Sequence, residues 1–175
     1  MDINTLITCP KRIERKKRPQ FRKEYRHYRM SIKLTCSESN YKMSMFLRRL
    51  VDFPEDFSVG LRLEGPNDIK EQDIVLVRYQ GPHGGQSAEK SSTDLHNTYH
   101  IHEYTQNDID CRRKNASYKE EGSFSSFEEA VIMFMKRCNI DDPNGIFDEE
   151  MNRVSQIRMD FDLLKTEREM DHDHQ

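Results

Sequence analysis

Apolar and polar residues alternate along much of the first half of the chain, which is the pattern of half-buried β-strands. In "YRMSIKLTC" every second residue is apolar or aromatic, namely Tyr28, Met30, Ile32, Leu34 and Cys36. The stretch "SESN" (37–40) predicts a turn, and "YKMSMFL" (41–47) resumes the alternation. The two segments therefore predict a hairpin.

Three further strands are predicted downstream. "FSVGLRL" (57–63) alternates again, and "DIVLVRY" (73–79) is a dense β-branched run that indicates a central strand. Residues 80–97 are rich in Gly and Ser and predict a long exposed loop. Loops of this length are usually functional or disordered. "TYHIHEY" (98–104) follows as the fifth strand.

The hydrophobic period then changes from two to that of a helix. "SSFEEAVIMFMKRC" (125–138) places apolar residues on one helical stripe after Ser125 or Ser126 as N-cap, with Glu128 or Glu129 completing a capping box. "DDPNG" (141–145) is expected to end this helix, and residues 147–168 predict a second one. The predicted fold class is α+β, an antiparallel sheet of about five strands followed by two helices.

Composition indicates that the ends of the chain are less compact than its middle. Of the 175 residues, 34% are hydrophobic and 34% charged, and the mean hydropathy is −0.96. We therefore expect a basic flexible arm over residues 1–20, an α+β domain over 21–140, and an acidic C-terminal helix and tail over 141–175. No apolar stretch approaches the roughly 20 residues of a membrane-spanning helix, so no membrane association is expected.

The cysteines and the N-terminus favour a cytoplasmic protein. The four cysteines are widely spaced and form no C-x-x-C pair, so they predict thiols and neither a disulfide framework nor a zinc knuckle. The first residues, "MDINTLITCPKR", lack the basic start and apolar run of a secretory signal.

The net charge of −3 conceals a basic front and an acidic back. Residues 11–29 hold ten Lys/Arg and two Glu, whereas residues 141–175 hold eleven acids and four Lys/Arg. Cations interleaved with Phe21, Tyr25 and Tyr28 can neutralise phosphates and stack bases, although a solvated tail or a docking segment fits the pattern too. The candidate nucleic-acid-binding residues are Lys11, Arg12, Arg15, Lys16, Lys17, Arg18, Arg22 and Lys23.

Histidines gather between positions 83 and 102. His100 and His102 are two positions apart in a predicted strand, so they share one face of the sheet. If the strand at 73–79 lies alongside, Arg78 and His83 reach the same face. Histidine can donate or accept a proton near neutral pH, and arginine can stabilise a developing phosphorane, as a metal-independent ribonuclease requires.

Two other interpretations of the histidines stay open. An H-x-H pair with His83 or His96 as third ligand would suit a metal site, and histidines on a solvated strand often have no chemical role. The sequence contains no P-loop, G-x-G-x-x-G, H-E-x-x-H or G-x-S-x-G motif, and no cofactor is expected.

Over residues 57–140, the order of "VRYQGPHGG", "TYHIHEY" and "SFSSFEEA" resembles the TumE-type toxins of bacterial toxin–antitoxin modules and related small histidine-motif families. Arg78, Tyr79, Pro82 and His83 match the first element, and His100 and His102 match the second. The chain has Gln80 where aspartate is usual, and a longer loop. The resemblance implies a growth-inhibiting bacterial or phage-related protein that acts on RNA and is held by a partner protein.

Taken together, these patterns predict a toxin or defence-associated effector that cleaves or binds RNA. The expected catalytic residues are His83, His100, His102 and Arg78. The alternative is a non-enzymatic interaction module, an adaptor or inhibitor, that docks partners through the basic arm and the acidic C-terminal helix.

Overall fold

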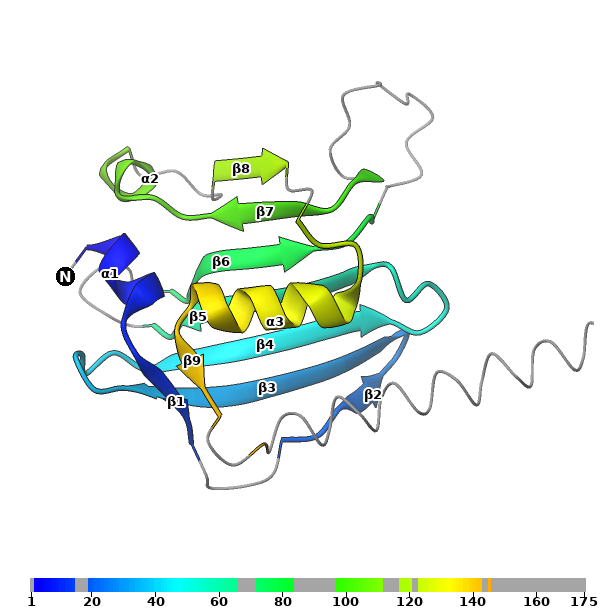
Figure 1. Cartoon of the computed structure of the whole chain (residues 1–175), viewed down its shortest axis with the longest axis horizontal. Coiled ribbons are helices and arrows are strands. Elements are labelled where there is room, and N and C mark those ends of the chain that lie inside the picture. Colours follow the sequence, from blue (N-terminus) through cyan, green and yellow to red (C-terminus); the bar gives the residue numbers. More distant parts are fainter. Residues whose placement is uncertain are drawn as a thin grey trace, which may run out of the picture. The chain divides into compact units, whose positions relative to one another are not determined.

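The chain folds around a single large sheet (Figure 1). The computed structural model describes residues 2–14, 19–65, 72–83, 97–111, 123–142 and 145, and the backbone of residues 117–120. The chain divides into two units, Met1–Asp141 and Asp142–Gln175, and the elements below belong to the first. In chain order they are α1 (Ile3–Thr8), β1 (Lys11–Ile13), β2 (Arg22–Glu24), β3 (His27–Cys36), β4 (Met43–Leu50), β5 (Phe57–Leu63), β6 (Ile74–Gln80), β7 (His100–Glu103), α2 (Gln106–Asp110), β8 (Ser117–Glu120), α3 (Phe127–Arg137) and β9 (Ile140–Asp141).

The described sheet has the strand order β8-β7-β6-β5-β4-β3-β1-β9, with β2 paired to β3. All described pairs are antiparallel except β1 with β9. The predicted strands correspond to β3 to β7, and β3 and β4 form the predicted hairpin. The predicted sheet of about five antiparallel strands is too small, because the described sheet has nine strands and includes one parallel pair, although the α+β class holds. The register shifts between Leu61 and Arg62 where β5 meets β6, which explains why the apolar run of β6 does not alternate strictly.

Helix α3 packs against one face of the sheet, across β5 and β6 (Figure 1). Its N-cap is Ser126, whose hydroxyl accepts from the Glu129 N–H, while the Glu129 carboxylate accepts from the Ser125 N–H. The helix buries Phe127, Ala130, Val131 and Phe134. Phe127 meets Phe57 and Phe134 meets Tyr79 in edge-to-face contacts at 5.4 and 5.8 Å, so the predicted apolar stripe forms the core.

The prediction of a flexible arm over residues 1–20 is wrong for the part that the structure describes. Asp2 caps α1, which buries Ile3, Leu6 and Ile7, and β1 pairs with both β3 and β9. The physical reason is that α1 and β1 are too short to show a hydrophobic period, yet their apolar side chains complete the core. Residues 15–18 lie outside the described residues.

Lys11 is also not the exposed nucleic-acid ligand that the basic run predicted. Its side chain is 1% exposed, and its ammonium donates to the carbonyl oxygens of Ile7, Cys9 and Cys138 at 2.8, 2.8 and 3.1 Å. Ile7 lies in the last turn of α1 and Cys138 is the C-cap of α3. A cation is favourable there because both helix ends carry unpaired carbonyls and partial negative charge.

Two details of the helical part also differ from the predictions. Helix α3 ends at Arg137, before the expected "DDPNG" stop, because Asn139 adopts a left-handed backbone (φ 49°) and residues 140–141 then join the sheet. The short α2, with its Thr105–Asp108 capping box, was not predicted. The predicted helix over 147–168 lies outside the described residues. None of the described helices is long and apolar enough to cross a membrane.

Candidate functional site

The face of the sheet opposite α3 collects polar and charged side chains. Along β3, exposed Arg29, Ser31 and Lys33 alternate with buried Met30 and Ile32. The strand register continues this polar face across the sheet in two rows, which together we call the open face. The first row is Arg22, Arg29, Arg48, Ser58, Gln80 and His100; the second is Ser31, Phe46, Gly60, Arg78 and His102.

A cavity of about 810 Å³ lies on the open face. Among the described residues, its lining includes six Lys/Arg side chains and two carboxylates, Glu14 and Glu24. The six cations are Arg22, Arg29, Lys33, Arg48, Arg62 and Arg78. Such a concave surface of one charge raises the local concentration of anions.

The floor of this cavity is aromatic. The ring of Phe46 lies directly over Gly60, and a Cβ atom at Gly60 would collide with that ring. The Arg62 guanidinium carbon lies 5.2 Å from the centroid of the same ring, within cation–π range. A flat aromatic surface flanked by guanidinium groups is an arrangement on which nucleic-acid bases stack.

Arg78 connects the cavity to the histidines. It lines the cavity and is the cross-strand neighbour of His102. Its Nε is buried and has no hydrogen-bond partner among the described residues. Burial, followed by the charge of Arg48, lowers the pKa of Arg78. Two neighbouring guanidinium groups are most stable when an anion lies between them.

Further along the open face, the pKa of His27 is also affected by the excess of positive charge. Burial lowers the pKa of His27, and the charges of Arg48 and Arg29 lower it further. In the described part of the chain, Arg48 forms one ion pair, with Asp56 at 3.7 Å, which is a long distance for such a pair. Positive charge therefore remains available to a ligand on this part of the face.

The three predicted histidines lie together at the end of the open face. The ring centroids of His83 and His100 are 5.0 Å apart, and those of His100 and His102 are also 5.0 Å apart. The Nδ1 atoms of His83 and His100 lie 3.0 and 2.8 Å from the carbonyl oxygens of Gly81 and Thr98. Because a carbonyl oxygen only accepts, both Nδ1 atoms carry protons in these contacts.

Gly81 explains how His83 comes back to this cluster. A Cβ atom at Gly81 would collide with the Glu55 carbonyl oxygen and contact the Phe57 ring. Glycine therefore lets the chain leave β6 tightly against β5, and His83 follows two residues later.

The three histidines differ in how much of each side chain is exposed to solvent. His100 is 0% exposed, whereas His83 and His102 are half-buried. A substrate cannot touch the His100 ring in this structure, so the prediction that His100 itself takes or gives a proton does not fit. Its burial between the other two rings suits a residue that positions them.

The described part of the chain offers the histidines no further ligands for a shared metal ion. There, no three His, Cys, Asp or Glu side chains come together in a way that could hold a metal ion. His96, a candidate third ligand, lies outside the described residues.

The remaining candidates from the basic run are divided between two places. Arg12, Arg22 and Lys23 are exposed on β1 and β2, and of these only Arg22 lines the cavity. Arg15, Lys16, Lys17 and Arg18 lie outside the described residues.

Most residues of the cavity lining were not among the candidates predicted from the sequence. Lys33, Arg48, Arg62 and Phe46 follow the basic run in the chain, and Arg29, its last residue, was not among the candidates. The sequence did contain a sign of this surface. The cations occupy the polar positions of strands in which polar and apolar residues alternate, so they lie on the face away from the core.

Comparisons with protein-family models, curated proteins and solved structures found no match to this chain.

Proposed function

We propose that this protein binds RNA across the open face of its sheet and cleaves it, without a metal ion, at the end where the histidines lie. One observation carries the proposal: Arg78 belongs both to the cation-lined cavity and to the histidine cluster. A strand of RNA that follows the cations would therefore bring a phosphodiester to His102. With the resemblance to TumE-type toxins, we extend the proposal to a growth-inhibiting effector that is held by a partner protein.

The open face has the features that single-stranded nucleic acids require. Cations contact successive phosphates without regard to sequence, and an exposed aromatic ring stacks a base. Six cations of the described residues line this surface, and the Arg62 guanidinium, which lies over the half-buried Phe46 ring, offers a flat face for a base. Adjacent strands lie about 4.8 Å apart, so the second row, from Ser31 to His102, spans roughly 19 Å, whereas Ser58, Gln80 and His100 of the first row are buried.

The chemistry needs two imidazoles in opposite protonation states. A neutral imidazole removes the proton from the ribose 2′-OH, and the 2′-oxygen then attacks the neighbouring phosphorus. A protonated imidazole gives its proton to the departing 5′-oxygen, leaving a 2′,3′-cyclic phosphate and a 5′-OH end. The guanidinium of Arg78 stabilises the charge that develops on the phosphorane oxygens.

His83 and His102 are the best candidates for the two proton-transfer roles, because both residues are half-buried and both lie close to the fully buried His100. The Nε2 atom of His102 is itself buried, so this ring must shift for Nε2 to reach a substrate. His100 is then a positioning residue. The neighbouring Gln80 donates from its amide nitrogen to the Ser58 hydroxyl at 3.3 Å, which holds Gln80 beside His100 in the first row.

The test is incubation of the purified protein with total RNA, with and without EDTA, beside single variants. We expect cleavage to survive EDTA, to fall by about 10²–10⁴-fold in His102→Ala and in His83→Ala, and to follow a bell-shaped pH profile. His27→Ala is the matched control at saturating RNA, because His27 lies on the open face but outside the cluster, so that its loss can weaken binding and should leave the rate of cleavage unchanged. Circular dichroism of each variant separates lost chemistry from lost folding.

The other outcomes have distinct meanings. Cleavage that disappears in EDTA would move the histidines into a metal site and overturn the proposed mechanism. RNA binding without any cleavage would favour the interaction module, which then uses the open face in place of the predicted arm. Absence of both binding and cleavage would overturn the proposal as a whole.

A further inference from the structure

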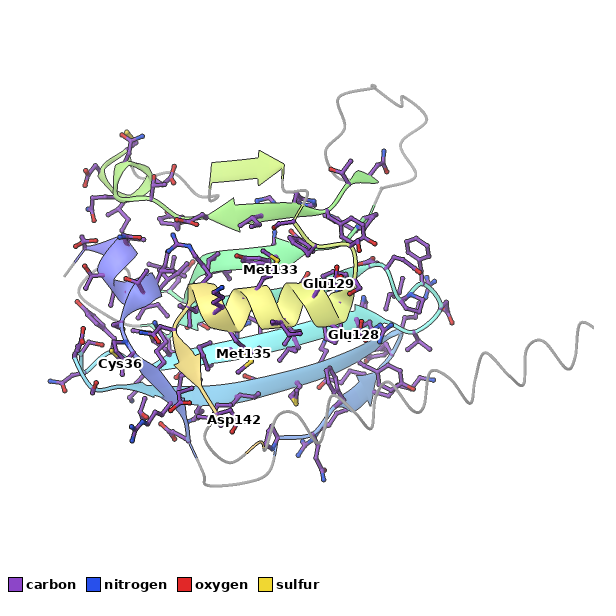
Figure 2. The ribbon with its side chains drawn as sticks, in the orientation of Figure 1. Cys36, Glu128, Glu129, Met133, Met135 and Asp142 are labelled. Carbon is purple, nitrogen blue, oxygen red and sulfur yellow. The ribbon has the colours of Figure 1, made fainter. Side chains whose placement is uncertain are left out.

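Two cysteines that are far apart in the sequence lie in contact near the edge of the sheet. The sulfur atoms of Cys9 and Cys36 are 2.6 Å apart, although the residues are separated by 27 positions. Cys9 is the C-cap of α1, and Cys36 is the last residue of β3, where it pairs with Lys11 of β1 (Figure 2 labels Cys36). A disulfide bond is about 2.0 Å long, so bond formation requires the sulfur atoms to approach by only about 0.6 Å.

The surroundings make the two thiols unequal. Cys9 is 3% exposed, whereas Cys36 is partly open to solvent. Burial, with hydrogen bonding to Cys36, raises the pKa of Cys9 to about 11. Burial also opposes ionisation of Cys36, but hydrogen bonding to Cys9 and to the following turn, with the nearby Lys11 charge, lowers its pKa overall. Cys36 is therefore the thiol that a dissolved oxidant can reach and that ionises more readily.

We propose that Cys9 and Cys36 form a peroxide-responsive dithiol pair, with Cys36 as the reacting thiol and Cys9 as the resolving thiol. The Cys36 thiolate attacks one oxygen of hydrogen peroxide, which breaks the O–O bond, forms the sulfenic acid and, with one proton, releases water. The Cys9 sulfur then attacks the Cys36 sulfur, loses its proton and displaces a second water molecule. The two sulfur atoms together lose two electrons, which reduce the peroxide.

The bond would fix one side of the cavity. β1 pairs with β3 and is followed directly by Glu14, which lines the cavity and whose N–H donates to the Lys33 carbonyl. A Cys9–Cys36 disulfide would tie the beginning of this segment covalently to β3. Because it also restricts the unfolded chain, oxidation should raise the Tm by roughly 5–10 °C.

The experiment uses the full chain in a Cys111→Ser background, since Cys111 is exposed and could form bonds between molecules. Reduced protein is treated with hydrogen peroxide, unfolded, alkylated and digested, and the peptides are identified by mass spectrometry. We expect one linked pair of peptides containing Cys9 and Cys36, lighter by two hydrogen atoms than the reduced pair. Cys138, which is 0% exposed, should stay a thiol and serves as the internal control.

Single variants separate the two roles. With Cys9→Ser, the Cys36 sulfenic acid should accumulate and react with dimedone; with Cys36→Ser, Cys9 should stay reduced. Formation of a Cys36 sulfinic acid in place of the linked pair, or the absence of any modification of Cys36 at peroxide levels that oxidise Cys111 in the parent chain, would overturn the proposal. RNA takes no part in this test, so its result is independent of the proposed function.

Discussion

At the scale of single residues, the fold gives similar cations opposite roles. Lys11 is fully buried and Arg78 is half-buried, but Lys11 donates to three backbone carbonyls, whereas no described residue pairs with the Nε of Arg78. The first arrangement stabilises the protein, and the second leaves a donor for a ligand. A basic run in the sequence does not distinguish these two cases, because the partners of Lys11 lie at the ends of two helices. The most distant partner, Cys138, is 127 positions from Lys11 in the sequence.

Lys11→Met should therefore lower the stability of the first unit. The substitution keeps the apolar part of the side chain but removes the charge that satisfies the carbonyls of Ile7, Cys9 and Cys138. We expect a loss of about 2–4 kcal/mol in the free energy of unfolding, measured by urea denaturation. Lys23→Met is the matched control on the exposed strand β2 and should change stability by less than about 0.5 kcal/mol. Equal stability of the two variants would contradict the structural role of Lys11.

At the scale of elements, the length of each strand decided whether it could be predicted from the sequence. Strands β3 to β7 were predicted because four of them have seven to ten residues and the fifth carries the H-x-H pattern. Strands β1, β2, β8 and β9 have two to four residues, too few to establish a period of two. Pairing with existing strands makes these short segments regular, and that pairing is a property of the whole sheet.

The same reasoning applies to the site. The spacing of His100 and His102 predicted a shared face, and the pairing of β6 with β7 confirms that Arg78 and His83 reach it. The cavity could not be predicted in the same way, since Arg29, Arg48 and Arg62 become neighbours of Arg78 only through the register of four strands.

Deletion of residues 1–13 should unfold the first unit and not merely remove a nucleic-acid-binding tail. The segment contributes the buried side chains of Ile3, Leu6, Ile7 and Ile13, and burial of each apolar side chain of this size is worth about 1.5–3 kcal/mol. The expected result is loss of the cooperative thermal transition, as monitored by circular dichroism. Arg12→Ala, which alters one exposed cation in the same segment, should keep the transition. A deleted protein that still melts cooperatively would restore the interpretation of this segment as an arm.

At the scale of the whole molecule, distribution of charge matters more than its total. The net charge is −3, yet six Lys/Arg and two Glu of the described residues line one cavity. Interactions between exposed charges are screened over about 8–10 Å at physiological salt, so a polyanion bound in the cavity responds to these cations far more than to distant acids. A mildly acidic protein can for this reason bind RNA.

Binding of single-stranded RNA should accordingly weaken steeply as salt increases. Each cation that neutralises a phosphate contributes about 0.7 to the slope of log K against log salt concentration for single strands. Arg48→Met and Arg78→Met should each reduce that slope by roughly one contact, measured by fluorescence anisotropy with a labelled oligonucleotide. Arg26→Met is the matched control, because Arg26 is exposed at the β2–β3 turn, pairs with Asp52 at 3.4 Å and does not line the cavity. If all three variants reduced the slope equally, the RNA would follow general surface charge and not the open face.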